Sequence, residues 1–230
     1  MTEVEMSRRE WAYNELRRRV MVGEFGVRTR LMEKHLAEEL GVSRTPVREA
    51  LVRLETDRLV VREDGGYYVA VPDLLHLRDL YELRITLELR GLTRVKESEL
   101  ARHDVALLEP LRDKWQELTE DLPEPDPQFV LLDEEFHVTL LRSSGNDELT
   151  EALETVNARI RHVRMYDFLT ADRIATSSAE HLQIVELVLA KDLDAALIAL
   201  HRHVGESLEV VERRAARAIT AMALHRHGVQ

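Results

Sequence analysis

The chain has 230 residues, a net charge of −11 and no cysteine, and 44% of its residues are hydrophobic. The lack of cysteine excludes disulfide bonds and zinc sites built on thiolates. No apolar run reaches the roughly 18 residues of a membrane helix, and the charged N-terminus does not match a secretory signal. We therefore expect a cytoplasmic protein.

The charge is distributed unevenly along the chain. Residues 1–72 hold 13 Lys and Arg against 13 Asp and Glu, so the whole acidic excess lies in residues 73–230. A neutral segment with basic residues gathered on one helix can bind DNA, because the local field matters more than the total charge. We expect two domains, residues 1–72 and residues 73–230, with the acidic domain held away from the phosphates.

Residues 31–51 have the pattern of a helix-turn-helix. Residues 31–40 form an apolar-periodic helix, and Gly41 follows where a helix is expected to stop. Ser43 stands at the N-cap position of a second helix. Pro46 lies in the first turn of that helix, where its missing N–H does little harm.

The second helix of this motif begins with basic and hydroxyl side chains. Arg44 and Arg48 are four residues apart and share a face, and Thr45 lies beside them. The N-terminal end of a recognition helix enters the major groove, and arginine binds both guanine and phosphate. An ordinary helical hairpin with two surface arginines is the alternative interpretation.

A hairpin follows the second helix. Residues 59–62 and 67–71 are β-rich, and the link Glu63-Asp64-Gly65-Gly66 favours a tight turn. Helices followed by such a hairpin indicate a winged helix-turn-helix.

Residues 9–71 resemble the DNA-binding domain of the GntR family of bacterial transcription regulators, above all in the run LAEELGVSRTPVREAL at 36–51. The resemblance implies DNA contacts from the recognition helix, from the wing backbone and from a basic residue on the preceding helix. The residues are Lys34, Ser43, Arg44, Thr45, Arg48, Gly65 and Gly66. Gly26-Val27-Arg28-Thr29 replaces the Pro-Gly usual in the family, so the loop shape there is expected to differ.

The rest of the chain has helical patterns only. An acidic, proline-rich link at 122–127 and a Ser-Ser-Gly-Asn turn at 143–146 are among its breaks. We expect helices near residues 73–97, 101–121, 126–144, 147–169, 173–190 and 193–226. The fold class is therefore mainly α: a winged helix-turn-helix plus an all-α six-helix antiparallel bundle.

Four polar residues fall on the apolar stripes of three bundle helices. Asp133 and His137 are i and i+4, while His181 and His203 share stripes with aliphatic residues on two later helices. A buried carboxylate needs a partner, and imidazole with carboxylate suits zinc, nickel, manganese or iron. Hydrogen-bonded core histidines without an ion are the alternative.

Residues 73–215 resemble the FCD effector domain of the FadR-type branch of the same family. The resemblance rests on Asp133-Glu134-Glu135-Phe136-His137, Asn146, Glu180-His181 and His203-Val204. Because many members bind a divalent metal there, it implies metal ligation by Asp133, His137, His181 and His203. His201 falls on another face, and we expect the remaining histidines on the surface: His35, His76, His103, His162, His225 and His227.

Arg84 also lies on an apolar stripe, in the first bundle helix. A buried arginine needs an anion, and an internal ion pair with Glu88 is one interpretation. The resemblance favours another, in which Arg84 faces a ligand carboxylate. Arg161 and Ser177 are further candidates for that pocket, although periodicity does not settle the direction of Arg161 or of neighbouring Arg164.

These features predict a ligand-responsive DNA-binding transcription regulator, and the family habit favours a repressor. The resemblance and operator symmetry imply a homodimer on a near-palindromic operator, with a divalent metal, zinc first, and a small carboxylate as effector. A sensor of the metal alone, an ion that only stabilises the bundle, and a metalloenzyme are alternatives.

Overall fold

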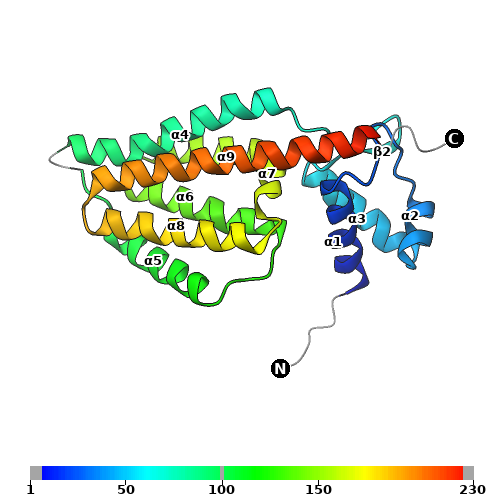
Figure 1. The fold of residues 1–230 in the computed structure, drawn as a ribbon, viewed down its shortest axis with the longest axis horizontal. Coiled ribbons are helices and arrows are strands. Elements are labelled where there is room, and N and C mark those ends of the chain that lie inside the picture. Colours follow the sequence, from blue (N-terminus) through cyan, green and yellow to red (C-terminus); the bar gives the residue numbers. More distant parts are fainter. Residues whose placement is uncertain (1–6, 99–100, 225–230) are drawn as a thin grey trace. The chain divides into compact units, whose positions relative to one another are not determined.

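A computed structural model describes residues 7–98 and 101–224 of the chain (Figure 1). The contacts divide the described residues into two compact units, with unit 1 made of residues up to 72 and from 213 onward and unit 2 made of the residues between 73 and 212. Unit 1 contains α1 (Arg8–Met21), α2 (Glu33–Leu40), α3 (Arg44–Thr56), β1 (Val60–Glu63) and β2 (Gly66–Val69). These elements make the expected winged helix-turn-helix.

The wing is an antiparallel hairpin in which Val60 pairs with Val69 and Glu63 with Gly66. Asp64 and Gly65 join the strands with φ angles of 48° and 69°, the left-handed values that a tight two-residue hairpin turn requires.

One helix boundary differs from the sequence prediction. The helix predicted to begin at residue 31 begins at Glu33. Leu31 instead forms an isolated antiparallel bridge with the wing, in which its backbone N–H donates to the carbonyl oxygen of Tyr67 at 2.8 Å. This pairing joins residues far apart in sequence, so local periodicity could not reveal it.

Unit 2 is a helical bundle (Figure 1). Its helices are α4 (Leu74–Glu97), α5 (Val105–Glu120), α6 (Val130–Ser143), α7 (Asp147–Arg164), α8 (Ala171–Leu189) and α9 (Leu193–Leu224). Short 3₁₀ turns, η1 (Pro127–Phe129) and η2 (Met165–Phe168), precede α6 and follow α7. The mainly-α prediction is confirmed, and no helix of the described residues has the length and hydrophobicity to cross a membrane.

Side-chain caps explain where several bundle helices begin. The carboxylate of Asp104 accepts a hydrogen bond from the N–H of Ala106 at 2.9 Å, so α5 begins at Val105 rather than at residue 101. Asn146 caps α7 in the same way, with its Oδ1 3.0 Å from the N–H of Leu149.

The last turns of α9 belong to unit 1 by their contacts, although the sequence analysis groups them with the second domain. The N–H of Val27 donates to the carbonyl oxygen of Met222 at 3.2 Å. Gly23 packs so closely that an added Cβ would lie 2.5 Å from the carbonyl oxygen of Ala218. Residues 213–224 therefore contribute to the core of unit 1.

Candidate metal centre and DNA-binding surface

Three helices of unit 2 bring four buried polar residues to one point. Asp133 and His137 lie one turn apart on α6, His181 lies on α8 and His203 on α9. One ligand atom from each residue lies within 4.8 Å of all the others. The structure thus gathers the four residues that the sequence analysis proposes as metal ligands.

The three imidazoles face one another through their Nε2 atoms. The separations are 3.0 Å between His181 and His203, and 3.3 Å from His137 to each of the other two. Oxygens of Asp133 lie 3.5 Å from His181 Nε2 and 3.6 Å from His137 Nε2. Ligands about 2.0–2.1 Å from a tetrahedral zinc ion lie about 3.3 Å apart, so the spacing of these atoms fits an ion.

Carboxylates behind two of the rings assign their protons. His137 Nδ1 lies 2.5 Å from Glu88 Oε2, and His203 Nδ1 lies 2.7 Å from Glu180 Oε2. An ionised carboxylate only accepts hydrogen bonds, so in the neutral rings each Nδ1 carries the proton and each Nε2 has a free lone pair. Two lone pairs 3.3 Å apart cannot satisfy each other, and a cation between them can. Carboxylate–imidazole pairs of this kind orient metal ligands in proteins.

The electrostatics of the cluster favour the ligand forms of its residues. Burial lowers the pKa of His181, with a further contribution from His203, and burial also lowers the pKa of His203 despite its bond to Glu180. Burial alone raises the pKa of Asp133, but the Arg164 guanidinium and the imidazoles outweigh it and hold that pKa well below its usual range. Neutral imidazoles and an ionised carboxylate are the forms that bind divalent ions.

Aromatic packing fixes the ring of His181. Phe136 stacks on it with ring centroids 4.0 Å apart, and Trp115 meets its edge at 4.2 Å. The sequence analysis did not identify this role for Trp115. His181 Nδ1 has no hydrogen-bond partner within the described residues, so the orientation of this ring depends on the two aromatic contacts.

The candidate arginines lie differently around this cluster. Arg84 is buried and its Nε donates to Glu88 at 2.7 Å, which is the internal ion pair considered above. Its two terminal nitrogens have no hydrogen-bond partner among the described residues, and one lies 3.8 Å from Asp133. Buried Ser177 Oγ likewise has none. Arg161 Nη2 donates to Glu134 Oε2 at 2.6 Å, and the Arg161 side chain is 41% exposed.

Arg164, whose direction the sequence left unsettled, is fully buried and donates to Asp133. A signal for this was present, because Val156, Ile160 and Arg164 follow one another at intervals of four on α7 and the first two are buried.

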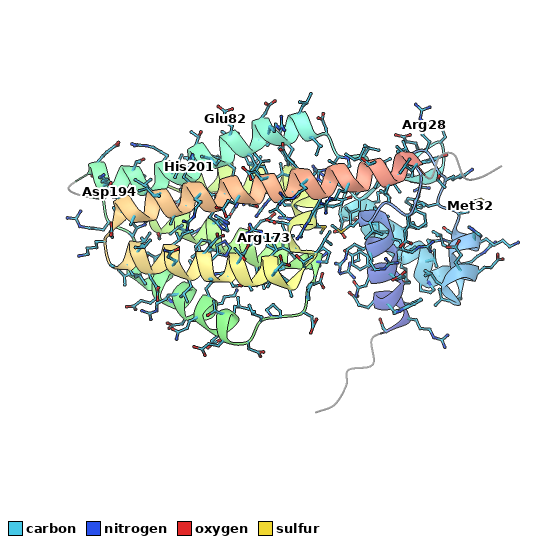
Figure 2. All side chains as sticks on the ribbon, in the orientation of Figure 1. Arg28, Met32, Glu82, Arg173, Asp194 and His201 are labelled. Carbon is cyan, nitrogen blue, oxygen red and sulfur yellow. The ribbon has the colours of Figure 1, made fainter. Side chains whose placement is uncertain are left out.

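The other histidines are placed in part as expected. His35, His76 and His201 are exposed, and Figure 2 shows His201 on the outer face of α9. His103 and His162 are half-buried, so the surface prediction is wrong for them. His103 is held because its Nδ1 lies 2.8 Å from Ser143 Oγ, a contact that depends on how 101–104 folds back on α6. His225 and His227 lie outside the described residues.

On unit 1, five of the seven proposed DNA-contacting residues line one groove. Lys34, Arg44, Arg48, Gly65 and Gly66 line it, with Arg30, Arg62 and Tyr67 among the other lining residues. Ser43 and Thr45 are exposed at the start of α3. Ser43 occupies the N-cap position, but its hydroxyl makes no capping bond.

Arg48 is held by a carboxylate on the preceding helix. Its Nε and Nη2 donate to the two oxygens of Glu33, both at 2.9 Å. The Arg48 side chain is nevertheless 64% exposed, and Nη1 makes no bond within the described residues. Arg48 is therefore oriented with part of its donor set free.

Comparison with known proteins agrees with both halves of this description. The model "Bacterial regulatory proteins, gntR family" matches residues 8–69, and the FCD domain model matches residues 79–206. The Nta operon transcriptional regulator of Aminobacter aminovorans is 34% identical over 187 residues, 79% of this chain and 86% of that protein. The HTH-type regulator YdhC of Bacillus subtilis is 30% identical over 198 residues, 86% of this chain and 88% of that protein.

Solved structures show the same fold. The Listeria monocytogenes regulator Lar superposes with a TM-score of 0.58 at 18% identity, over 93% of this chain and 98% of that one. Escherichia coli McbR gives a TM-score of 0.51 at 24% identity, over 90% and 98% of the two chains. The family models and the relatives thus show a DNA-binding transcription regulator rather than an enzyme. The chain belongs to the GntR family of bacterial regulatory proteins and carries an FCD domain.

Proposed function

We propose that the chain is a homodimeric cytoplasmic repressor whose affinity for a near-palindromic operator is set by a small carboxylate bound with a divalent ion in unit 2. The observation that carries the proposal is the convergence of three Nε2 atoms and the Asp133 carboxylate on one buried point. Asp133, His137, His181 and His203 would hold the ion. Zinc is the first expectation, with nickel, manganese and iron as alternatives.

The charges around the centre favour an anionic effector. The buried charged residues of unit 2 are the carboxylates Glu88, Asp133, Glu134 and Asp167 and the guanidiniums Arg84, Arg164 and Arg173. Their net charge is one negative charge, and it stays so when the part-buried residues Glu180 and Arg161 are added. A divalent ion would reverse it to one positive charge, which a carboxylate would neutralise.

Groups without partners support an organic ligand beside the ion. The terminal nitrogens of Arg84 and the hydroxyl of Ser177 are buried donors that nothing satisfies within the described residues. Such groups are costly unless a ligand or water meets them. A bound ion would supply a Lewis acid for one carboxylate oxygen, and Arg84 would donate to another oxygen of the ligand.

An ion that only stabilises the bundle is a second candidate, favoured by the complete burial of the four residues. The void beside Glu88 and His137 is too small for a water molecule. A protein that loses thermal stability in chelator but whose operator binding responds to no carboxylate would support the structural ion.

The DNA half of the proposal is tested with Arg44→Ala and Arg48→Ala. An operator duplex is first selected from a random library, and its affinity is measured by fluorescence anisotropy at physiological salt. Each substitution should weaken operator binding roughly 10- to 100-fold, because a bidentate arginine contact is worth about 1–3 kcal/mol. Metal content and effector binding should not change.

Arg112→Ala is the matched control, since Arg112 is an arginine of α5 that pairs with neighbouring Asp113. It should leave operator affinity unchanged. An Arg44→Ala or Arg48→Ala protein with full operator affinity would remove that arginine from the DNA-binding surface.

A further inference from the structure

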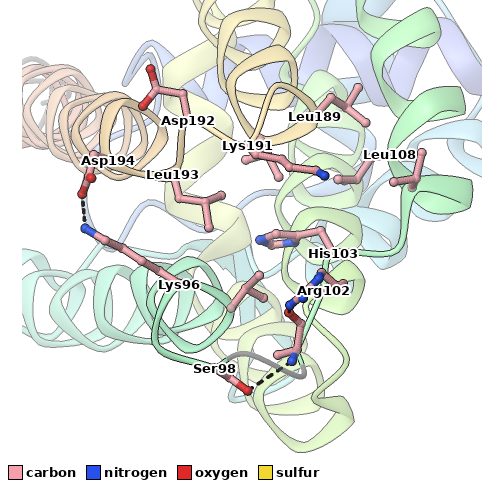
Figure 3. A pocket seen from close by; sticks show the side chains of 14 residues that line it. Lys96, Ser98, Arg102, His103, Leu108, Leu189, Lys191, Asp192, Leu193 and Asp194 are labelled. Carbon is pink, nitrogen blue, oxygen red and sulfur yellow. Dashed lines mark hydrogen bonds and ion pairs between the residues drawn. The ribbon is translucent and has the colours of Figure 1, made fainter.

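A second cavity of unit 2 shares no residue with the metal centre. It has a volume of about 690 Å³ and lies where the end of α4, the start of α5 and the turn between α8 and α9 meet (Figure 3). This volume is in the range of small-molecule sites, roughly 300–1,000 Å³. Half of its lining residues are aliphatic, among them Val95, Leu108, Val188, Leu189 and Leu193, and the other half are polar or charged.

The cavity carries two cations with no carboxylate partner. Lys96 also lines it, but it is paired with Asp194. The other lining carboxylate, Asp192, caps α9 by accepting from the N–H of Ala195 at 3.1 Å. Lys191 has no side-chain bond within the described residues, and the only bond of Arg102 is to the adjacent Ala101 carbonyl oxygen at 2.7 Å. Arg102 and Lys191 are both exposed, and neither forms an ion pair with the two lining carboxylates.

The backbone of Lys191 is left-handed. Its φ is 63°, the left-handed conformation at a helix end where glycine is usual. The N–H of Lys191 donates to Val188 and the next N–H donates to Leu187, so the turn itself is a regular helix terminus. A side chain with a Cβ is disfavoured in this conformation, so glycine is a compatible substitution here. In Figure 3 the Lys191 ammonium extends between Leu108 and His103.

His103 adds a neutral polar surface. Ser143 Oγ donates to the carbonyl oxygen of Leu140 at 2.7 Å, so it accepts from the Nδ1–H of His103. Burial and the nearby Arg94 guanidinium lower the pKa of His103 to about 4, so the ring carries no charge at neutral pH. His103 therefore adds no positive charge to the cavity, where Lys96, Arg102 and Lys191 stand against Asp192 and Asp194.

We propose that this cavity binds an organic carboxylate with an apolar body, of the medium-chain or aryl type, whose carboxylate is held by Arg102 and Lys191 and whose body packs on the aliphatic walls. The site is separate from the effector site at the metal centre. His103 connects it to α6, because Ser143 ends the helix that carries Asp133 and His137.

Octanoate is the probe, measured by isothermal titration with the full-length protein, both zinc-loaded and treated with chelator. Octanoate should bind with Kd below about 1 mM in both forms, and acetate and 1-octanol should bind at least tenfold more weakly, since each lacks one half of the ligand. Lys191→Gly removes the ammonium and suits the left-handed backbone, and Arg102→Gln removes the second charge. Each should weaken octanoate roughly tenfold.

Arg58→Gly is the matched control, because Arg58 is an exposed cation of unit 1 with the same left-handed backbone, φ 58°. It should bind octanoate as the parent protein does. Failure of the parent protein to bind octanoate would overturn the proposal. Lys191→Gly and Arg102→Gln proteins that bind octanoate as tightly as the parent would overturn it as well. Binding that disappears with chelator would instead assign octanoate to the metal centre and leave the proposed function intact.

Discussion

Asp133 accepts from the Arg164 guanidinium and lies 3.8 Å from a terminal nitrogen of Arg84, and an ion bound between the imidazoles would add further positive charge. The carboxylate and the guanidinium are both fully buried, and removing one member of a buried ion pair leaves an uncompensated charge. Metal binding should therefore lessen the dependence of Asp133 on Arg164.

Arg164→Met should lower the free energy of unfolding by about 3–5 kcal/mol in chelator, and by clearly less in excess zinc. Urea unfolding followed by circular dichroism measures both. Arg142→Met is the control, because Arg142 forms an exposed ion pair with Glu154 of the kind worth about 0–1 kcal/mol. An equal loss for Arg164→Met with and without zinc would mean that Asp133 does not bind the ion.

Residues on regular stripes were predictable, and residues placed by irregular segments were not. Asp133, His137, His181 and His203 could be placed together because helical periodicity assigns each to a buried face. His103 could not, because its burial depends on how 101–104 folds back on α6.

At the scale of elements, the sequence predicts the helices through their periodicity and their caps. The hairpin was predictable from Asp64 and Gly65, whose types favour the turn they form. Two features were not predictable locally, the bridge of Leu31 with Tyr67 and the packing of residues 213–224 in unit 1. Both depend on contacts between distant parts of the chain.

The packing of α9 in unit 1 is tested with two Gly→Ala substitutions. Gly23→Ala should destabilise the protein by roughly 2–4 kcal/mol, because φ is 78° and the new Cβ would lie 2.5 Å from the backbone at Ala218. Gly205→Ala, in the interior of α9 with no atom within 4 Å of the new Cβ, should stabilise it by about 0.5–1 kcal/mol.

Thermal and urea unfolding read out both variants. A Gly23→Ala protein as stable as the parent would show that the last turns of α9 do not pack tightly against this loop.

At the scale of the whole molecule, one helix belongs to both units. α9 carries His203 of the proposed centre, and its residues 213–224 contribute to the core of unit 1. The FCD model ends at residue 206, so this last part of α9 lies beyond the match. A change in how His203 is held would therefore act on a helix that unit 1 shares.

Native mass spectrometry of the untagged protein tests the central claim, the metal-anchored sensor, most directly. It should show a dimer of 26.6 kDa chains with one divalent ion per chain. His201→Ala should keep the ion and His203→Ala should lose it. The two residues are only two positions apart on α9, but His203 is buried and His201 is exposed. A parent protein that stays metal-free when offered zinc, nickel and manganese would contradict the account, as would a His203→Ala protein that binds the ion as the parent does.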